Sequence, residues 1–131
     1  MKIAVDFDGT CVSHAFPAIG VDIGAVPVLQ ELVEQGHQLI LNTMRSDGQE
    51  IGDVLTDAVN WFKENNIQLY AIGKDPNQSK WTSSDKCYAQ LFIDDAALGC
   101  PLISSVDHGL YVDWVKVRKY LMSKNILSKK I

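Results

Sequence analysis

Short apolar runs alternate along this chain with segments in which apolar residues recur every three or four positions. The short runs predict four buried strands, each closed by polar or glycine residues. The strands are expected at residues 2–6, 38–42, 68–72 and 89–93. The spacing of three and four predicts helices, because such residues share one helix face. The helices are expected at residues 25–35, 48–65 and 112–122.

Turn and cap residues support these boundaries. Pro27 suits the first turn of the first helix, Gly36 suits its end, and Asp47 can cap the second helix. Glycine, proline and serine mark residues 7–23 and 73–84 as loops. The alternation predicts an α/β fold, a three-layer Rossmann-like domain with a mainly parallel sheet flanked by helices. In such sheets ligands bind at the carboxyl ends of the strands.

Composition narrows the class of protein. A length of 131 residues, 47% hydrophobic and 21% charged, predicts one globular domain over residues 1–131. A net charge of −4 lacks the basic excess of a nucleic-acid-binding surface. Neither a membrane span nor a signal peptide is expected, because every apolar run is too short. The three cysteines have no CxxC spacing, so we expect a reduced, cytoplasmic protein without a zinc motif or disulfides.

The first strand is followed by Asp6-Phe7-Asp8-Gly9-Thr10. Two carboxylates beside a glycine can hold a hard cation such as Mg²⁺ through oxygen atoms. A carboxylate can also act as a nucleophile toward phosphorus. The alternative is a plain turn, because Asp and Gly are common turn residues.

Two later strands also end in polar residues. Thr43 closes the second strand, where its hydroxyl and free backbone N–H groups can hold a phosphate oxygen, or where it merely ends the strand. Asp94 and Asp95 close the fourth strand. Adjacent acids repel each other, so they indicate either a bound cation or a solvated turn.

Lysines upstream of the fourth strand are candidates for balancing this negative charge. Lys86 precedes that strand directly, while Lys74 and Lys80 lie in the loop before it and compete for the role. The alternative for each is an ordinary surface lysine. His14 can touch the substrate or hydrogen-bond within its loop, and Arg45 can contact an anionic leaving group or pair with Asp47 or Asp53.

Together these pieces resemble the haloacid dehalogenase-like (HAD) phosphohydrolases. The segment Asp6 to Thr10 looks like their DxDGT first motif, and Thr43 falls where their second motif lies. Lys86 fits the third motif, and Asp94-Asp95 fits the acidic fourth. The resemblance runs over residues 2–103.

A small HAD subgroup of uncharacterised function is similar in finer detail. Its pattern is DFDGT, then a His and "P.IG", then "LILWTMR", then "IDD.ALG.PL". The counterparts here are His14, Pro17, Ile19-Gly20, residues 39–45 and residues 93–102. The chain carries Asn42 where that subgroup tends to carry Trp, a difference that alters the expected pocket wall.

The resemblance implies a phosphatase that works through an aspartyl-phosphate. Asp6 would be the nucleophile, and Asp8 the acid for the leaving group and then the base for water. Mg²⁺ would be held by the Asp6 carboxylate, the Asp8 backbone carbonyl and the Asp95 side chain. Asp94 would act on the metal through a water or orient Lys86.

The resemblance also implies how the phosphate is bound. Thr43 and the backbone N–H of Met44 would bind phosphate oxygens, together with Lys86. Thr10, His14 and Arg45 are possible substrate contacts. An acid at position 8 separates phosphatases from dehalogenases in this superfamily.

Substrate selection in this superfamily often depends on an inserted cap domain. The gaps after the first and second motifs, residues 11–24 and 44–68, are too short to hold one. An open site would accept a small phosphomonoester or a larger phosphorylated substrate, or a homo-oligomer would cover it. A polynucleotide-end phosphatase and a non-catalytic phospho-ligand-binding module are the alternatives. The acidic charge argues against the first, and the intact acidic motifs argue against the second.

Overall fold

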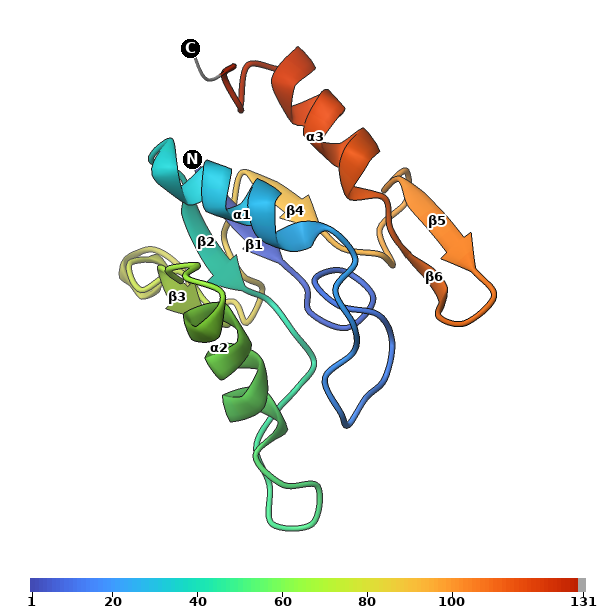
Figure 1. Cartoon of the computed structure of the whole chain (residues 1–131). Coiled ribbons are helices and arrows are strands. Elements are labelled where there is room, and N and C mark those ends of the chain that lie inside the picture. Colours follow the sequence, from blue (N-terminus) through green and yellow to red (C-terminus); the bar gives the residue numbers. More distant parts are fainter. Residues whose placement is uncertain (130–131) are drawn as a thin grey trace.

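The architecture was analysed in a computed structural model, which describes residues 1–129 (Figure 1). The strands are β1 (Lys2–Val5), β2 (Gln38–Leu41), β3 (Ala71–Ile72), β4 (Leu91–Ile93), β5 (Leu102–Ser105) and β6 (Gly109–Val112). The helices are α1 (Ala25–Glu34), α2 (Val54–Glu64), α3 (Trp114–Ser123) and the short 3-10 helix η1 (Gln78–Lys80).

The main sheet has four parallel strands in the order β3-β2-β1-β4. β1 is central, and its last residue, Val5, is paired with Leu41 of β2 and Ile93 of β4. The carboxyl ends of these three strands are therefore level with one another. The predicted α/β fold with a mainly parallel sheet is confirmed, and the polar residues that follow β1, β2 and β4 meet at one edge.

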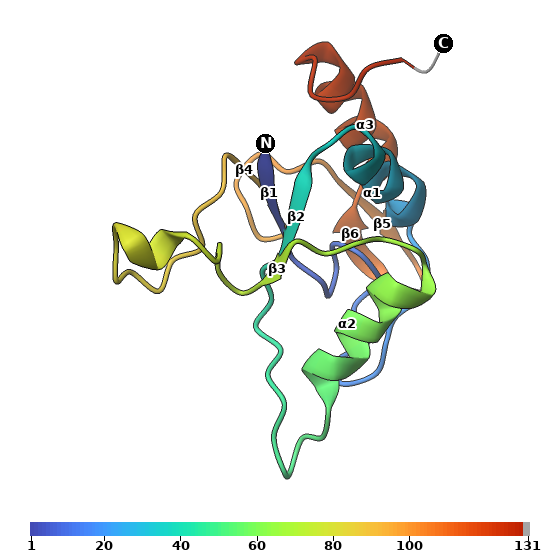
Figure 2. The ribbon, with the colours of Figure 1, turned by 90° about the vertical axis from the view of Figure 1, so that its left-hand side faces the viewer.

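The core lies between the sheet and the three α-helices. Ile3 and Val5 of β1 face this side because alternate residues of a strand point to opposite faces. Leu29 of α1, Phe62 of α2 and Leu121 of α3 pack into the same cluster. Figure 2 shows the α-helices on one side of the sheet.

The other face of the sheet is covered by residues 73–90, which include η1 (Figure 2). Cys87 of this segment packs on Ala4 and Ile40, the residues that alternate with the core-facing ones. The two faces therefore differ. One is covered by α-helices and the other by an irregular segment that connects β3 to β4.

The helix expected at residues 48–65 begins later, at Val54. Gly48 and Gly52 exchange backbone hydrogen bonds of 3.1 and 2.8 Å, so this stretch forms a tight loop instead. The predicted cap is nevertheless present. Asp47 Oδ1 accepts hydrogen bonds from the N–H groups of Leu55 and Thr56, at 2.8 and 3.0 Å, across the loop.

The β5–β6 hairpin was not among the predicted elements, and it stands apart from the main sheet (Figure 1). Its base is joined to the loop after β1, because the Val112 N–H donates to the Gly9 carbonyl at 3.0 Å. Residues 106–108 form the turn between the two strands, and Gly109 begins β6 with a positive φ of 66°. An apolar run on each side of a short polar stretch with glycine is a hairpin pattern. Residues 1–129 contain no cap over the sheet edge, and none of their helices is long and apolar enough to cross a bilayer.

Trp114 joins α3 to the loop after β1. Its indole N–H donates to the Thr10 carbonyl at 2.7 Å, and the residue is only 3% exposed. We expect Trp114→Phe to lower the free energy of unfolding by ~1–3 kcal/mol, because it leaves a buried carbonyl without its donor. Urea denaturation measures the change. The control is Trp81→Phe, at a residue that is 63% exposed; equal losses in both variants would contradict the assignment.

Candidate active site

Three carboxylates converge at the carboxyl edge of the sheet. Asp6 follows β1, while Asp94 and Asp95 follow the neighbouring strand β4. One carboxylate oxygen from each lies within 4.8 Å of the others, and all three residues are half-buried. We refer to these three residues as the acid cluster. The structure thus brings together the first and fourth motifs, which are more than 80 positions apart in the sequence.

Thr10 forms hydrogen bonds with two residues of the acid cluster. Its hydroxyl lies 2.9 Å from Asp6 Oδ2 and 3.3 Å from Asp95 Oδ1, and it accepts a hydrogen bond from the Asp95 N–H at 3.0 Å. Thr10 is fully buried. Its position assigns it to holding the aspartates in place, a contact that differs from the substrate contact expected from sequence.

The pKa of Asp6 is raised from 3.8 to about 7. Burial is the largest cause, followed by the negative charge of Asp94 and a hydrogen bond with Asp95. A divalent cation among these oxygens would offset both burial and repulsion. Carboxylate oxygens are the ligands that Mg²⁺ prefers, so the donor set of the acid cluster fits a hard cation.

His14 lies over the acid cluster. Its Nε2 is 2.8 Å from Asp95 Oδ2, and its side chain is 53% exposed. Gly9, with a φ of +79°, provides the space for this contact, because a Cβ at this position would overlap the His14 ring and Asp95 Oδ2. His14, expected as a possible substrate contact, therefore lies against one of the expected metal ligands.

The side chain of Asp8 is bound by Arg45, so its contacts differ from those of the acid cluster. Its Oδ2 accepts from Arg45 Nε at 2.8 Å, and its Oδ1 accepts from Arg45 Nη2 at 2.7 Å. Such a bidentate pair fixes the plane of the carboxylate. Arg45 was expected to contact an anionic group or to pair with Asp47 or Asp53, but the structure pairs it with Asp8, the expected acid–base residue.

The second strand supplies the expected phosphate-binding groups at the same edge. The Thr43 hydroxyl accepts from the Arg45 N–H at 3.1 Å, a contact that leaves the hydroxyl proton available for donation. Within residues 1–129 the Met44 N–H has no hydrogen-bond partner, and the Met44 side chain is exposed. Both groups can therefore donate to a ligand.

None of the candidate lysines reaches the acid cluster. Lys74 pairs with Asp85 at 3.0 Å, and Lys86 Nζ lies 5.9 Å from the centre of the Phe92 ring. Lys80 ends η1. Among the described residues no ion pair joins these lysines to an aspartate of the acid cluster. The choice among the three stays open.

The raised pKa of Asp6 predicts how the stability of the metal-free protein depends on pH. Between pH 3.8 and about 7 the folded protein holds a proton that the unfolded chain has lost. The free energy of unfolding should therefore fall as pH rises through this window. Asp6→Asn should remove that part of the decline, as measured by thermal unfolding in the presence of a chelator. Asp107→Asn, an exposed aspartate in the hairpin turn, is the control; an unchanged slope in Asp6→Asn would contradict the prediction.

No family model and no curated protein sequence matches the chain. A search of solved structures finds a conserved protein from Bacteroides thetaiotaomicron, with a TM-score of 0.73 and 37% sequence identity. The match covers 98% of this chain and 93% of that protein. Because this identity extends over nearly the whole of both chains, the chain belongs to the same family as that conserved Bacteroides protein.

Proposed function

We propose that the protein is a Mg²⁺-dependent phosphohydrolase of the HAD type, which cleaves a phosphomonoester through an aspartyl-phosphate. The observation that carries the proposal is the acid cluster at the end of the central strand, with Asp6 at its centre. Thr43 and the free Met44 N–H at the same edge support it. A solvated turn needs no half-buried carboxylate with a pKa of about 7.

The acid cluster would hold the metal. Asp6 and Asp95 offer carboxylate oxygens, Asp8 its backbone carbonyl, and Asp94 an oxygen directly or through water. When bound, Mg²⁺ would offset the repulsion between the aspartates and a phosphate dianion. His14 would then share Asp95 with the metal or give way to it.

The reaction would use Asp6 and Asp8 in turn. An Asp6 oxygen attacks phosphorus, and the bond from phosphorus to the leaving oxygen breaks as Asp8 gives that oxygen a proton. Asp8 then takes a proton from water, whose oxygen attacks phosphorus and releases Asp6 and inorganic phosphate. Thr43 and the Met44 N–H would hold the phosphate oxygens during both steps. One of Lys74, Lys80 and Lys86 would supply a further positive charge.

The open edge of the sheet sets the range of substrates. Because residues 1–129 contain no cap, a small phosphomonoester or a larger phosphorylated molecule can reach the acid cluster. A polynucleotide end remains a candidate only if a phosphorylated oligonucleotide is turned over. A non-catalytic phospho-ligand module predicts binding without turnover.

The central prediction concerns Asp6 and Asp8. Wild-type protein with Mg²⁺ should release phosphate from p-nitrophenyl phosphate or from one member of a phosphoester panel. Asp6→Asn should reduce turnover to background, and Asp8→Asn should lower kcat by ~10²–10⁴, the usual contribution of general acid–base catalysis. The control Asp107→Asn should keep wild-type activity. Tight binding of phosphate without turnover of any phosphoester would contradict the phosphohydrolase and support the non-catalytic phospho-ligand-binding module.

Metal binding can be tested separately from turnover. Calorimetric titration with Mg²⁺ should show one site, and Asp95→Asn should weaken binding at least ~10-fold, because a lost ligand or its partner typically costs that much. Asp107→Asn again serves as the control for the loss of one acid. If Asp95→Asn bound Mg²⁺ as wild type does, the acid cluster would not be the metal site.

A further inference from the structure

Arg45 is the most fully bonded polar side chain near the acid cluster. We propose that it is a positioning residue, which orients the Asp8 carboxylate and fastens residues 13–20 over the site without binding substrate. This inference rests on the proposed function, because the orientation of Asp8 matters through its acid–base role. It replaces the expectation that Arg45 contacts an anionic substrate group.

The first argument is the number of donors. An arginine side chain has five N–H groups. Arg45 Nε and Nη2 donate to the two oxygens of Asp8, at 2.8 and 2.7 Å. Nη1 donates to the carbonyls of Pro17 and Val54, at 3.3 and 3.0 Å, and Nη2 also donates to the Ala18 carbonyl at 2.8 Å. All five are used, so none remains for a substrate.

The second argument is burial. The Arg45 side chain is only 1% exposed, and its guanidinium carbon lies 5.0 and 5.1 Å from the ring centres of Phe7 and Phe16. These cation–π contacts add to the hydrogen bonds. A buried, stacked guanidinium cannot swing out toward a ligand without breaking five hydrogen bonds.

The third argument is connectivity. Arg45 joins three segments that no strand pairing connects, namely Asp8 after β1, Pro17 and Ala18 in the following loop, and Val54 at the start of α2. Proton transfer requires the carboxylate to lie ~2.6–3.2 Å from the reacting oxygen. A side chain that fixes the plane of Asp8 therefore acts on kcat, whereas a substrate contact would act on KM.

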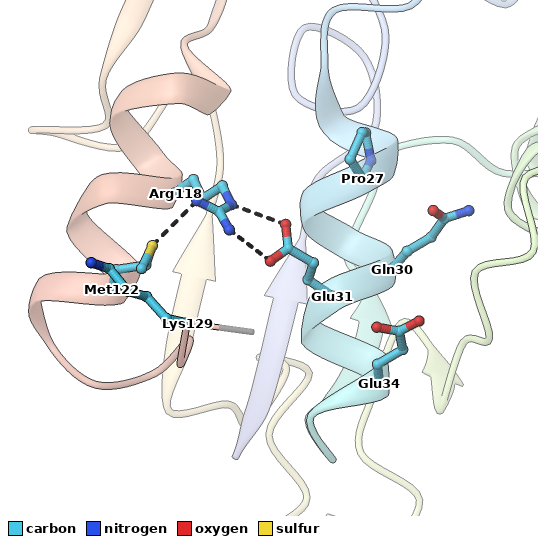
Figure 3. Close-up of a pocket in the computed structure, with 7 residues that line it drawn as sticks. All are labelled: Pro27, Gln30, Glu31, Glu34, Arg118, Met122 and Lys129. Carbon is cyan, nitrogen blue, oxygen red and sulfur yellow. Dashed lines mark hydrogen bonds and ion pairs between the residues drawn. The ribbon is translucent and has the colours of Figure 1, made fainter. Parts of the chain in front are cut away.

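The chain offers a matched control. Arg118 of α3 makes the same kind of bidentate pair, with Nε and Nη2 each 2.9 Å from an oxygen of Glu31 on α1. Figure 3 shows this pair in a groove between the two helices. No residue of the acid cluster lines that groove. Arg118→Met thus removes an ion pair of the same bidentate geometry away from the proposed chemistry, at a side chain that is 40% exposed.

The test is a double-mutant cycle with a substrate that the wild type turns over. Arg45→Met should lower kcat by about tenfold or more and leave KM within about twofold, since the donors that it removes bind Asp8 and loop carbonyls and not the substrate. In an Asp8→Asn background the same substitution should change kcat less than about twofold, because its effect acts through Asp8. Arg45→Lys keeps the charge without the bidentate geometry and should lie between the two. Arg118→Met should match wild type.

Three results would overturn the proposal. The first is a rise in KM at constant kcat in Arg45→Met. The second is a double variant whose loss of kcat equals the product of the losses in Arg45→Met and Asp8→Asn. The third is an equal loss in Arg118→Met. Hydrogen exchange of residues 13–20 provides a readout without turnover, and it should speed up in Arg45→Met and Arg45→Lys but not in Arg118→Met. An inactive wild type would refute the proposed function. Unchanged hydrogen exchange of residues 13–20 in Arg45→Met would separately refute the fastening role.

Discussion

Mutual repulsion among three carboxylates is the constraint on which the rest of the site depends. The parallel register of β1 and β4 places Asp6 beside Asp94 and Asp95, with oxygens within 4.8 Å of one another. Thr10 has a single hydroxyl proton for two of them, so hydrogen bonding inside the chain leaves negative charge uncompensated. Burial, and after it the charge of Asp94 and a hydrogen bond with Asp95, raises the pKa of Asp6 to about 7. A bound cation would remove this negative charge, and the proposed phosphohydrolase reaction would use the same cation.

The negative charge of Asp8 is balanced differently from that of the acid cluster. Its charge is balanced within the chain by the buried Arg45, whereas the acid cluster has no buried cation among the described residues. The four acids are thus divided into one fixed by a guanidinium and three that no described Arg or Lys pairs with. Under the proposed function, Asp8 would move protons while its plane is fixed by Arg45, and the acid cluster would hold metal and phosphorus.

Residue patterns predicted most of the fold and the position of the site. The ends of the strands can be predicted because apolar runs stop at polar residues. A parallel sheet then brings those ends together at one edge. The start of α2 was placed too early, because the pattern does not show that Gly48 and Gly52 pair with each other. The contacts of Arg45 with Asp8, and of His14 with Asp95, could not be predicted from spacing. They join residues 37 and 81 positions apart through loops whose paths depend on the folded chain.

Burial separates the fixed partners of the site from the replaceable ones. Thr10 and Arg45 are buried, so breaking their hydrogen bonds would leave unpaired polar groups at a cost of ~1–3 kcal/mol each. The His14 side chain is 53% exposed, and an exposed contact of this kind contributes only ~0–1 kcal/mol. Under the proposed function a metal would therefore displace His14 from Asp95 at little cost, while Thr10 and Arg45 would keep the aspartates in place.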